Sequence, residues 1–320
     1  MKIIALVMAR NEAWILPTFL SSVRPVADEI IALDDRSTDN TKQILFSAGA
    51  KVFESEEVTK SDWHEAAARQ KLLDLGRASG GTHFICLDAD EALSGNFIKH
   101  GREKILALKP GQKLVMRWPF LWKGCNYYVQ DSRCEFTGLF KDFIFCDQPG
   151  WNFQNSFLHF GKTPGPNLPQ NTVKLPESEG VVMHFAYADF KNAIIRQAWY
   201  RCMELIKNPK AYVKINNRYY LPKQGREFKL AQVPEAWLKG IVLPQLTTTL
   251  PDPWRLKIIL SWFEQYGVEF FEPLEIWGIN ELREEFEKKT GRNPKNSRLH
   301  IYLQPFIKLR RKIKSLFKRA

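Results

Sequence analysis

Four short strand-like runs, separated by helical segments, constrain the fold of this chain most strongly. The runs cover residues 3–9, 29–35, 51–55 and 82–88. Each is too short for a stable helix, and the most apolar of them suit strands that are buried on both faces. Helical spacing or helix-forming composition occupies the intervals, at residues 13–23, 37–50 and 62–78. This alternation predicts an α/β fold with a mostly parallel sheet and right-handed crossovers.

Polar clusters follow three of these runs. The clusters are Arg10–Asn11–Glu12, Asp34–Asp35 and Asp88–Ala89–Asp90. Because ligands of open α/β sheets bind beyond the carboxyl ends of the strands, we expect the clusters to converge on one rim. Asp88, Asp90 and Glu91 would repel one another unless a positive group lies among them. Carboxylates are ligands suited to Mg²⁺ or Mn²⁺, which could bridge them to a diphosphate. The alternative is a solvated acidic turn in which Asp88 caps the following helix.

The rest of the chain divides by composition. Residues 114–184 are aromatic and punctuated by Gly and Pro, which predicts short strands and loops that complete a site. Helical spacing returns at residues 188–207, 253–267 and 279–291. We therefore expect a catalytic domain at 1–187, with halves at 1–110 and 111–187, a helical extension at 188–300 and a tail at 301–320.

Charge and cysteine content limit the partners and the compartment. The net charge of +12 favours an anionic partner: nucleic acid, an acidic membrane or a phosphorylated ligand. Five cysteines without a CxxC pair are typical of free thiols in a reducing compartment. The apolar start is short for a signal peptide, and no apolar run approaches the roughly 20 residues that span a bilayer. We expect a cytoplasmic protein.

The tail at residues 301–320 combines an apolar stripe with seven Lys or Arg residues and no acid. The stripe comprises Leu303, Phe306, Ile307, Ile313, Leu316 and Phe317. This pattern is typical of a helix that lies in the interface of an anionic membrane, here the cytoplasmic face. A helix docked on its own domain and a disordered basic tail are the alternatives.

Four segments together resemble the family 2 glycosyltransferases of the GT-A fold. They are VMARNE, LDDRSTDNT, EAAARQKLL and ICLDADE, in that order within residues 1–95. They resemble that family's first strand and turn, its acidic second-strand signature, its Ala-Arg helix and its DxD metal site. The LDADE form resembles enzymes that build bacterial lipopolysaccharide core and related surface glycans. The resemblance implies a Rossmann-like domain that acts as a hexosyltransferase. It would move a sugar from a nucleotide sugar, with UDP favoured, to a glycan or glycolipid by using Mn²⁺ or Mg²⁺.

The resemblance also implies roles for single residues. The nucleotide-sugar-binding residues would be Ala9, Asn11, Glu12, Asp35, Arg69 and Asp88. Asp88 and Asp90 would hold the metal. His184, in the segment VVMHFAYADFKNAIIRQAWY, would be a third metal ligand or a phosphate contact. Glu91, a further catalytic candidate, would orient the donor sugar or would only cap the segment that follows.

The catalytic base is the least defined part of this prediction. Inverting transfer needs a carboxylate that takes a proton from the acceptor hydroxyl. The candidates are Asp131, Glu135 and Asp142, none of which stands in a clear motif. Aromatic residues of the same region, Trp118 among them, would stack on sugars or pack the core.

Three other functions fit parts of the sequence. A nucleotidyltransferase also uses metal-bridged phosphates, but it usually carries a Gly-rich loop after the first strand, and ARNEAW has no glycine. A nucleic-acid-binding protein would suit the positive charge, but that charge gathers in the tail while the N-terminal rim is acidic. We therefore expect no nucleic-acid partner. A glycosyltransferase-like protein that binds without catalysing stays open, because the base is undefined.

Overall fold

The computed structural model divides the chain into two compact units. It describes residues 1–55, 65–132, 134, 137–153, 161–219, 228–246 and 254–295. The first unit comprises Met1–Phe190 and Phe228–Thr249, and the second comprises Lys191–Glu227 and Leu250–Ala320. The helical extension expected at 188–300 is therefore interrupted, because the chain returns to the first unit at Phe228–Thr249. The tail expected at 301–320 lies outside the described residues.

A seven-stranded mixed sheet forms the centre of the first unit, in the order β10-β6-β9-β4-β1-β2-β3. Its strands are β1 (Ile3–Ala9), β2 (Glu29–Asp34), β3 (Lys51–Glu54), β4 (His83–Cys86), β6 (Lys113–Arg117), β9 (Phe140–Cys146) and β10 (Thr172–Lys174). β1 pairs in parallel with β2 and β4, and β2 pairs in parallel with β3. β9 runs antiparallel between β4 and β6. The predicted α/β fold is confirmed, and the four expected strands are β1 to β4.

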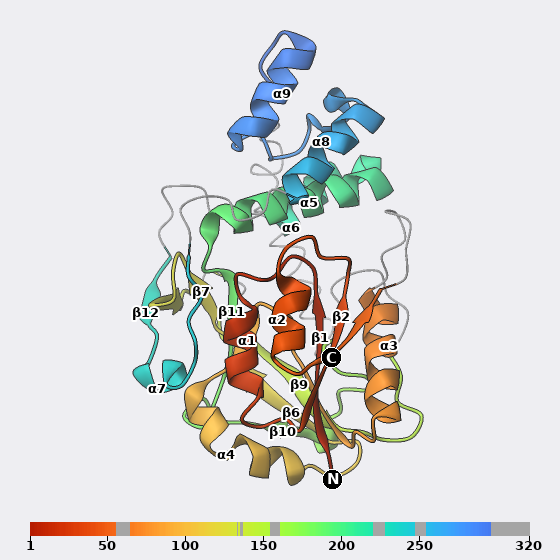
Figure 1. The fold of residues 1–320 in the computed structure, drawn as a ribbon. Helices are drawn as coiled ribbons and strands as arrows, with labels where there is room; N and C mark the ends of the chain where they lie inside the picture. Colours follow the sequence, from red (N-terminus) through yellow and green to blue (C-terminus); the bar gives the residue numbers. More distant parts are fainter. Residues whose placement is uncertain are drawn as a thin grey trace, which may run out of the picture. The chain divides into compact units, whose positions relative to one another are not determined.

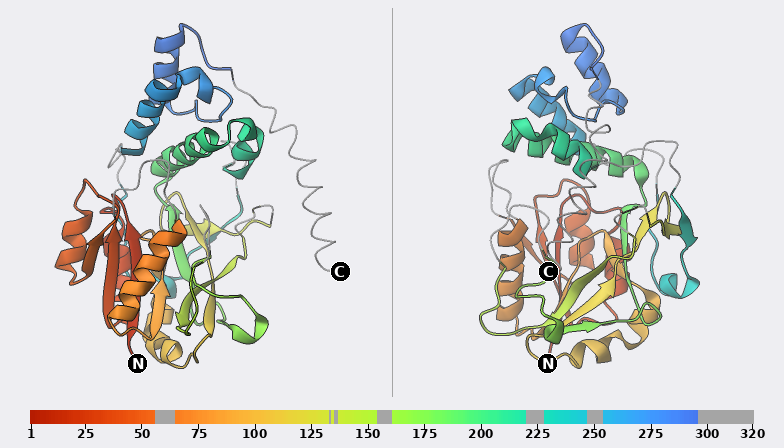
Figure 2. Two further views of the ribbon diagram at one scale, coloured as in Figure 1. Left: turned by 90° about the vertical axis from the view of Figure 1, so that its right-hand side faces the viewer. Right: turned by 180° about the vertical axis from the view of Figure 1, so that it is seen from behind.

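Helices cover both faces of this sheet (Figure 2). They are α1 (Leu16–Val23), α2 (Thr41–Ser47), α3 (Glu65–Ala78) and α4 (Gly95–Leu106). α1 and α2 lie on one face and α3 on the other, because the connection from β3 to β4 returns across the sheet (Figures 1 and 2). A Cβ at Gly76 would lie 2.5 Å from Phe84 Cε1, so only glycine lets α3 approach β4 this closely.

A second, five-stranded sheet has the order β12-β8-β7-β11-β5. Its strands are β5 (Glu91–Leu93), β7 (Phe120–Trp122), β8 (Tyr127–Val129), β11 (Val182–Tyr187) and β12 (Leu230–Gln232). The short helix α7 (Glu235–Leu238) follows β12. Two pairings position the site, because His184 of β11 lies opposite Glu91 of β5 and opposite Phe120 of β7.

The second unit is helical. Its helices are α5 (Phe190–Lys207), which starts at the last residue of the first unit, α6 (Tyr212–Arg218), α8 (Trp254–Tyr266) and α9 (Asn280–Thr290). Single 3₁₀ turns lie at Pro169–Asn171 in the first unit, and at Pro209–Ala211 and Val268–Phe271 in the second. Phe263 of α8 packs against Trp277, which in turn contacts Phe286 of α9. Among the described residues, none of the helices has the length and apolarity to cross a bilayer.

Candidate functional site

Asp35 lies where β1, β2 and β3 end. Its backbone N donates to the carbonyl of Ala9 at 2.8 Å. Its carboxylate accepts from Arg10 Nη1 at 2.9 Å and from Ser55 Oγ at 2.7 Å. Two of the residues predicted to bind the nucleotide, Ala9 and Asp35, are therefore neighbours at the carboxyl ends of the parallel strands.

Asn11 and Glu12 form the turn after β1. Asn11 has a φ of 53°, a left-handed conformation that asparagine tolerates better than most residues. Its Oδ1 accepts from the backbone N of Thr38 at 2.7 Å. The backbone N of Glu12 donates to Thr41 Oγ1 at 2.8 Å, and its Oε2 accepts from Trp14 Nε1 at 3.0 Å. Asn11 therefore shapes the turn that presents this part of the rim.

Two positive side chains lie among the carboxylates that follow β4. Arg69 Nη2 donates to Asp88 Oδ1 at 2.9 Å and to Glu65 Oε1 at 2.8 Å. Lys162 Nζ binds Asp88 Oδ2 and lies 2.9 and 3.0 Å from the two oxygens of Glu91. Glu91 also accepts from the backbone N of Asp88 at 2.7 Å. Arg69 thus contacts Asp88, another of the residues predicted to bind the nucleotide sugar, whereas sequence reasoning missed Lys162.

Burial strengthens these contacts. The side chains of Lys162 and Glu91 are 4% and 0% exposed, while that of Asp88 is 38% exposed. Burial alone would raise the pKa of Asp88, but Lys162 and Arg69 outweigh it and hold the pKa well below the ordinary value. Burial raises the pKa of Glu91 above its ordinary value. Burial lowers the pKa of Lys162, but Asp88 and Glu91 reverse this effect, so its pKa is raised and it stays charged.

Asp90 faces a different partner. The pairing of β11 with β5 brings His184 Nε2 to 3.5 Å from Asp90 Oδ1. The imidazole stacks on the ring of Trp118, with centroids 4.6 Å apart and planes 11° from parallel. The side chains of Asp90 and His184 are 13% and 12% exposed. Two of the three predicted metal ligands therefore lie side by side.

The predicted ligands differ in how well they suit a divalent cation. Both oxygens of Asp88 already accept from charged nitrogens, on Arg69 and Lys162, and these positive charges would repel a metal at that carboxylate. Asp90 and His184 offer a carboxylate oxygen and an imidazole nitrogen, which suit Mn²⁺. Within the described part of the chain, no group of three or more His, Cys, Asp or Glu side chains could hold a metal. A metal bound at Asp90 and His184 would therefore need further ligands from outside the described residues, such as the oxygens of a substrate.

Two of the candidate bases, Asp131 and Asp142, accept hydrogen bonds from residues of loops further along the chain. Asp131 is 1% exposed, and its Oδ2 accepts from the backbone N of Lys229 at 3.0 Å. Asp142 of β9 accepts from Thr163 Oγ1 and lies 3.5 Å from Lys113 Nζ. The third candidate, Glu135, lies outside the described residues. The identity of the catalytic base stays a prediction.

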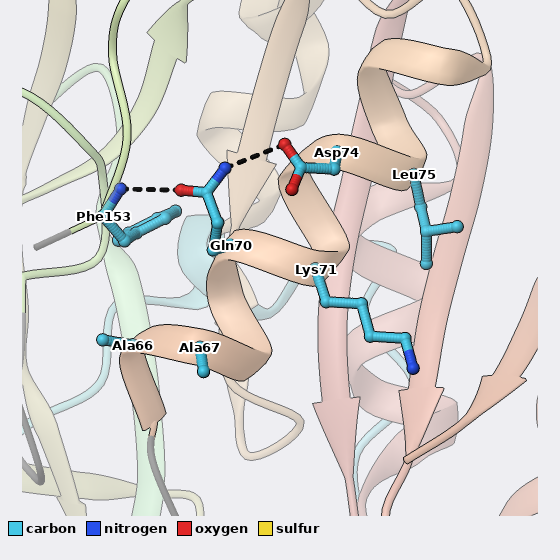
Figure 3. A pocket seen from close by; sticks show the side chains of 7 residues that line it. All are labelled: Ala66, Ala67, Gln70, Lys71, Asp74, Leu75 and Phe153. Atoms are coloured by element: carbon cyan, nitrogen blue, oxygen red, sulfur yellow. Dashed lines mark hydrogen bonds between the residues drawn. The ribbon is translucent and has the colours of Figure 1, made fainter. Parts of the chain in front are cut away.

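A hollow of about 560 Å³ lies along α3, outside the rim (Figure 3). Within it Gln70 bridges two groups, donating to Asp74 Oδ1 and accepting from the backbone N of Phe153, both at 2.8 Å. The hollow is lined by Ala66, Ala67, Gln70, Lys71, Asp74, Leu75 and Phe153. None of these residues belongs to the rim clusters, so we do not place the substrate there.

A family comparison assigns the part of the chain that carries the rim. Residues 5–122 match the sequence model described as Glycosyl transferase family 2. These residues form a family 2 glycosyltransferase domain. The match confirms the predicted family, and it covers strands β1 to β4 of the parallel part of the sheet. It includes the rim residues from Ala9 to Glu91 and ends before Lys162 and His184.

Two curated relatives resemble the same part of the chain. A TPR repeat-containing protein of Synechococcus elongatus is 39% identical over 88 residues, which are 27% of this chain and 20% of that protein. An uncharacterized glycosyltransferase of Rickettsia bellii is 36% identical over 74 residues, 19% of this chain and 25% of that protein. The chain therefore spans only a fifth to a quarter of the length of these relatives.

Two solved structures are more distant. One is glucosyl-3-phosphoglycerate synthase from Mycobacterium tuberculosis, in complex with Mn²⁺, UDP and glucosyl-3-phosphoglycerate. It is 22% identical with a TM-score of 0.29, over 38% of this chain and 44% of that one. The other, S. aureus TarS, is 24% identical with a TM-score of 0.28, over 39% of this chain and 22% of that one. At these TM-scores neither structure carries an argument about substrate, acceptor or metal.

Proposed function

We propose that this protein is a glycosyltransferase that moves a sugar from a nucleotide-sugar donor to a hydroxyl group of a glycan or glycolipid. The observation that carries this proposal is the placement of Asp35, Asp88 and Asp90 at the carboxyl ends of parallel strands in a family 2 domain. This edge of an open α/β sheet is where nucleotides bind. A UDP-sugar is the favoured donor.

Each side of the rim would have its own task. The carboxylate of Asp35 would accept hydrogen bonds from the ribose or the base. Asp88 is partly exposed and held by Arg69 and Lys162, so it would contact the ribose while those two side chains fix its position. A divalent cation bound by Asp90 and His184 would act as a Lewis acid toward the departing diphosphate.

Glu91 would act through Asp88. Its side chain is fully buried and accepts from the backbone N of Asp88 as well as from Lys162. It would therefore set the position of Asp88 and leave contact with the donor sugar to other groups. In inverting transfer, Asp131, Glu135 or Asp142 would remove the proton from the attacking hydroxyl.

The test is a screen for donor binding and turnover. Thermal shift and hydrolysis would be measured with UDP-, GDP-, CMP- and dTDP-sugars, each with Mn²⁺ and with EDTA. We expect one nucleotide series to stabilise the protein and to be hydrolysed slowly. Binding without turnover, even with candidate acceptors, would favour a non-catalytic glycosyltransferase-like protein. Absence of binding in every series would refute the proposal.

We also propose that the enzyme works in cell-surface polysaccharide synthesis, such as that of lipopolysaccharide, at the cytoplasmic face of the membrane. The support is the sequence of residues 301–320, in which basic residues accompany an apolar stripe. Each basic residue near an anionic surface contributes about 1 kcal/mol, which salt screens. Full-length protein should therefore sediment with anionic vesicles at low salt, and a variant with Lys308, Lys312 and Lys314 changed to Gln should sediment less. Equal sedimentation of the two proteins would contradict the proposal.

A further inference from the structure

The indole of Trp118 brings two lysines together beside the acidic rim. Lys141 Nζ lies 3.8 Å from the centroid of this ring, and Lys162 Nζ lies 5.7 Å from it. An aromatic face attracts a cation, but by far less than a carboxylate does within a low-dielectric site. Two like charges on one ring therefore need anions to balance them.

Lys162 has its anions within the chain, whereas Lys141 has none among the described residues. Lys162 pairs with Asp88 and Glu91. Lys141 is near enough for the charges of Asp88 and Glu91 to act on it, yet its Nζ forms no ion pair or hydrogen bond in that part of the chain. Burial, and then the charge of Lys162, lower the pKa of Lys141, which reflects this missing partner.

Lys113, a fully buried lysine, shows what a structural role looks like in this fold. Lys113 of β6 has a side chain that is 0% exposed. Its Nζ donates to Asn167 Oδ1 at 2.6 Å and to the carbonyl of Gly165 at 2.9 Å, and it lies 3.5 Å from Asp142 Oδ2. Lys141 lacks any such set of acceptors, so packing alone does not explain its position.

Trp118, whose ring Lys141 covers, has a second hydrogen-bond donor that lacks an acceptor among the described residues. Trp118 is 8% exposed, and its Nε1 is buried without a hydrogen-bond partner among the described residues. A buried N–H group without an acceptor is uncommon and is often satisfied by a ligand or a water molecule. Lys141 Nζ and Trp118 Nε1 therefore both lack an acceptor among the described residues. The oxygens of an anionic ligand could accept hydrogen bonds from both groups.

We propose that Lys141 binds the diphosphate of the nucleotide-sugar donor, and that donor binding depends more on this lysine than on a divalent metal. The inference rests on the proposed function, which places a nucleoside diphosphate at this rim. Arg69 and Lys162 already neutralise Asp88, which removes one predicted metal ligand, while Lys141 supplies the charge that the phosphates need. The phosphate oxygens would accept from Nζ, and no bond is made or broken in this binding step.

The experiment compares a nucleotide with its phosphate-free nucleoside. Dissociation constants for UDP and uridine would be measured by titration calorimetry with wild type, in Mn²⁺ and in EDTA, and with Lys141→Met. We expect Lys141→Met to weaken UDP binding about tenfold, as for the loss of one charge-assisted hydrogen bond, and to leave uridine binding unchanged. The UDP affinity of wild type should fall by less than about threefold in EDTA, because the ammonium group of Lys141 remains.

Two further variants separate charge from packing. Lys141→Arg keeps the positive charge and should retain most of the UDP affinity. Lys174→Met is the matched control, because Lys174 Nζ lies 3.9 Å from the ring of Phe140 but is exposed on the edge strand β10. It should bind UDP as wild type does.

The outcomes are distinguishable. If wild type binds UDP only in Mn²⁺, or if Lys141→Met binds UDP as wild type does, the inference is wrong while the proposed function stands. If wild type binds neither UDP nor uridine, and no other nucleotide in the donor screen, the proposed function fails and the inference fails with it.

Discussion

The two acidic clusters of the rim differ in where their positive partners come from. Asp35 pairs with Arg10, which follows the neighbouring strand and has a side chain that is 34% exposed. Asp88 pairs with Arg69 of α3 and with Lys162, which lies 74 residues further along the chain. Both partners of Asp88 are nearly buried. The first cluster can therefore relax in water when it is altered, whereas the second depends on charge balance inside the protein.

The largest expected effect is the loss of Lys162. Lys162→Met would leave buried Glu91 without its cation, and we expect the free energy of unfolding to fall by about 3–5 kcal/mol. Urea denaturation would measure this loss. The double variant Lys162→Met/Glu91→Gln removes both charges and should recover part of it. An unfolding free energy equal to that of wild type for Lys162→Met would show that the second cluster is not held by this ion pair.

The next largest effect is on sugar transfer, and it distinguishes the role of Asp90 from that of Asp88. Asp90→Asn should lower sugar transfer at least about a hundredfold, because it removes a charge at the proposed metal site. Its midpoint of thermal unfolding should stay near that of wild type. Asp88→Asn should lower the midpoint as well, since it leaves Arg69 and Lys162 facing each other. Near-normal turnover of Asp90→Asn in Mn²⁺ would contradict the placement of the metal at Asp90.

A smaller effect is expected at the first cluster. Asp35→Ala should weaken UDP binding about tenfold, the loss of one or two hydrogen bonds from a carboxylate, with little change in stability. Calorimetry would measure the affinity. Glu54→Gln is the matched control, because Glu54 is a carboxylate at the end of β3 that is 61% exposed. Unchanged affinity in Asp35→Ala would place the nucleotide elsewhere.

The smallest expected effect is a change with pH, in the acid range, of the stability that Asp88 contributes. The pKa of Asp88 is lowered in the folded protein, so its contribution to stability is present above the unfolded value of 3.8 and is lost as the pH falls through the folded pKa. The difference in unfolding free energy between wild type and Asp88→Asn should therefore be constant near neutral pH. It should narrow below pH 3.8. A difference that stayed constant in acid would mean that charge does not cause it.

The same contrast explains what the sequence could predict. Strands β1 to β4 were predictable because each is a short run with its own polar ending, and the acids at those endings had to meet at one edge of a parallel sheet. Arg69 was assigned to the site because the segment EAAARQKLL resembles the Ala-Arg helix of the family. Its buried position follows from helical spacing, since Ala66, Leu72 and Leu73 share the same buried face.

The partners from later in the chain could not be predicted. Lys162 stands in GKTPGPN, a segment with Gly and Pro but no periodic pattern, so nothing local distinguishes it from a surface lysine. Lys141 stands on β9, whose place between β4 and β6 depends on long-range pairing. His184 was assigned from a resemblance, and its contact with Asp90 arises from the pairing of β11 with β5. A single sequence does not encode such pairings in a readable local pattern.

The position of β9 has a consequence for how the protein is made. The segment that matches the family ends at residue 122, but β9 begins only at Phe140 and fills the sheet between β4 and β6. A chain emerging from the ribosome therefore presents β4 and β6 with open edges until the 24 residues from 123 to 146 have been added. Asp88 and Glu91 lack Lys162 until 40 residues have been added, a wait of a few seconds at ordinary rates of synthesis. During that interval the nascent chain offers unpaired strand edges to other chains. The segment that matches the family therefore depends on β9 and Lys162, which lie after it in the chain, to complete its sheet and its charge balance.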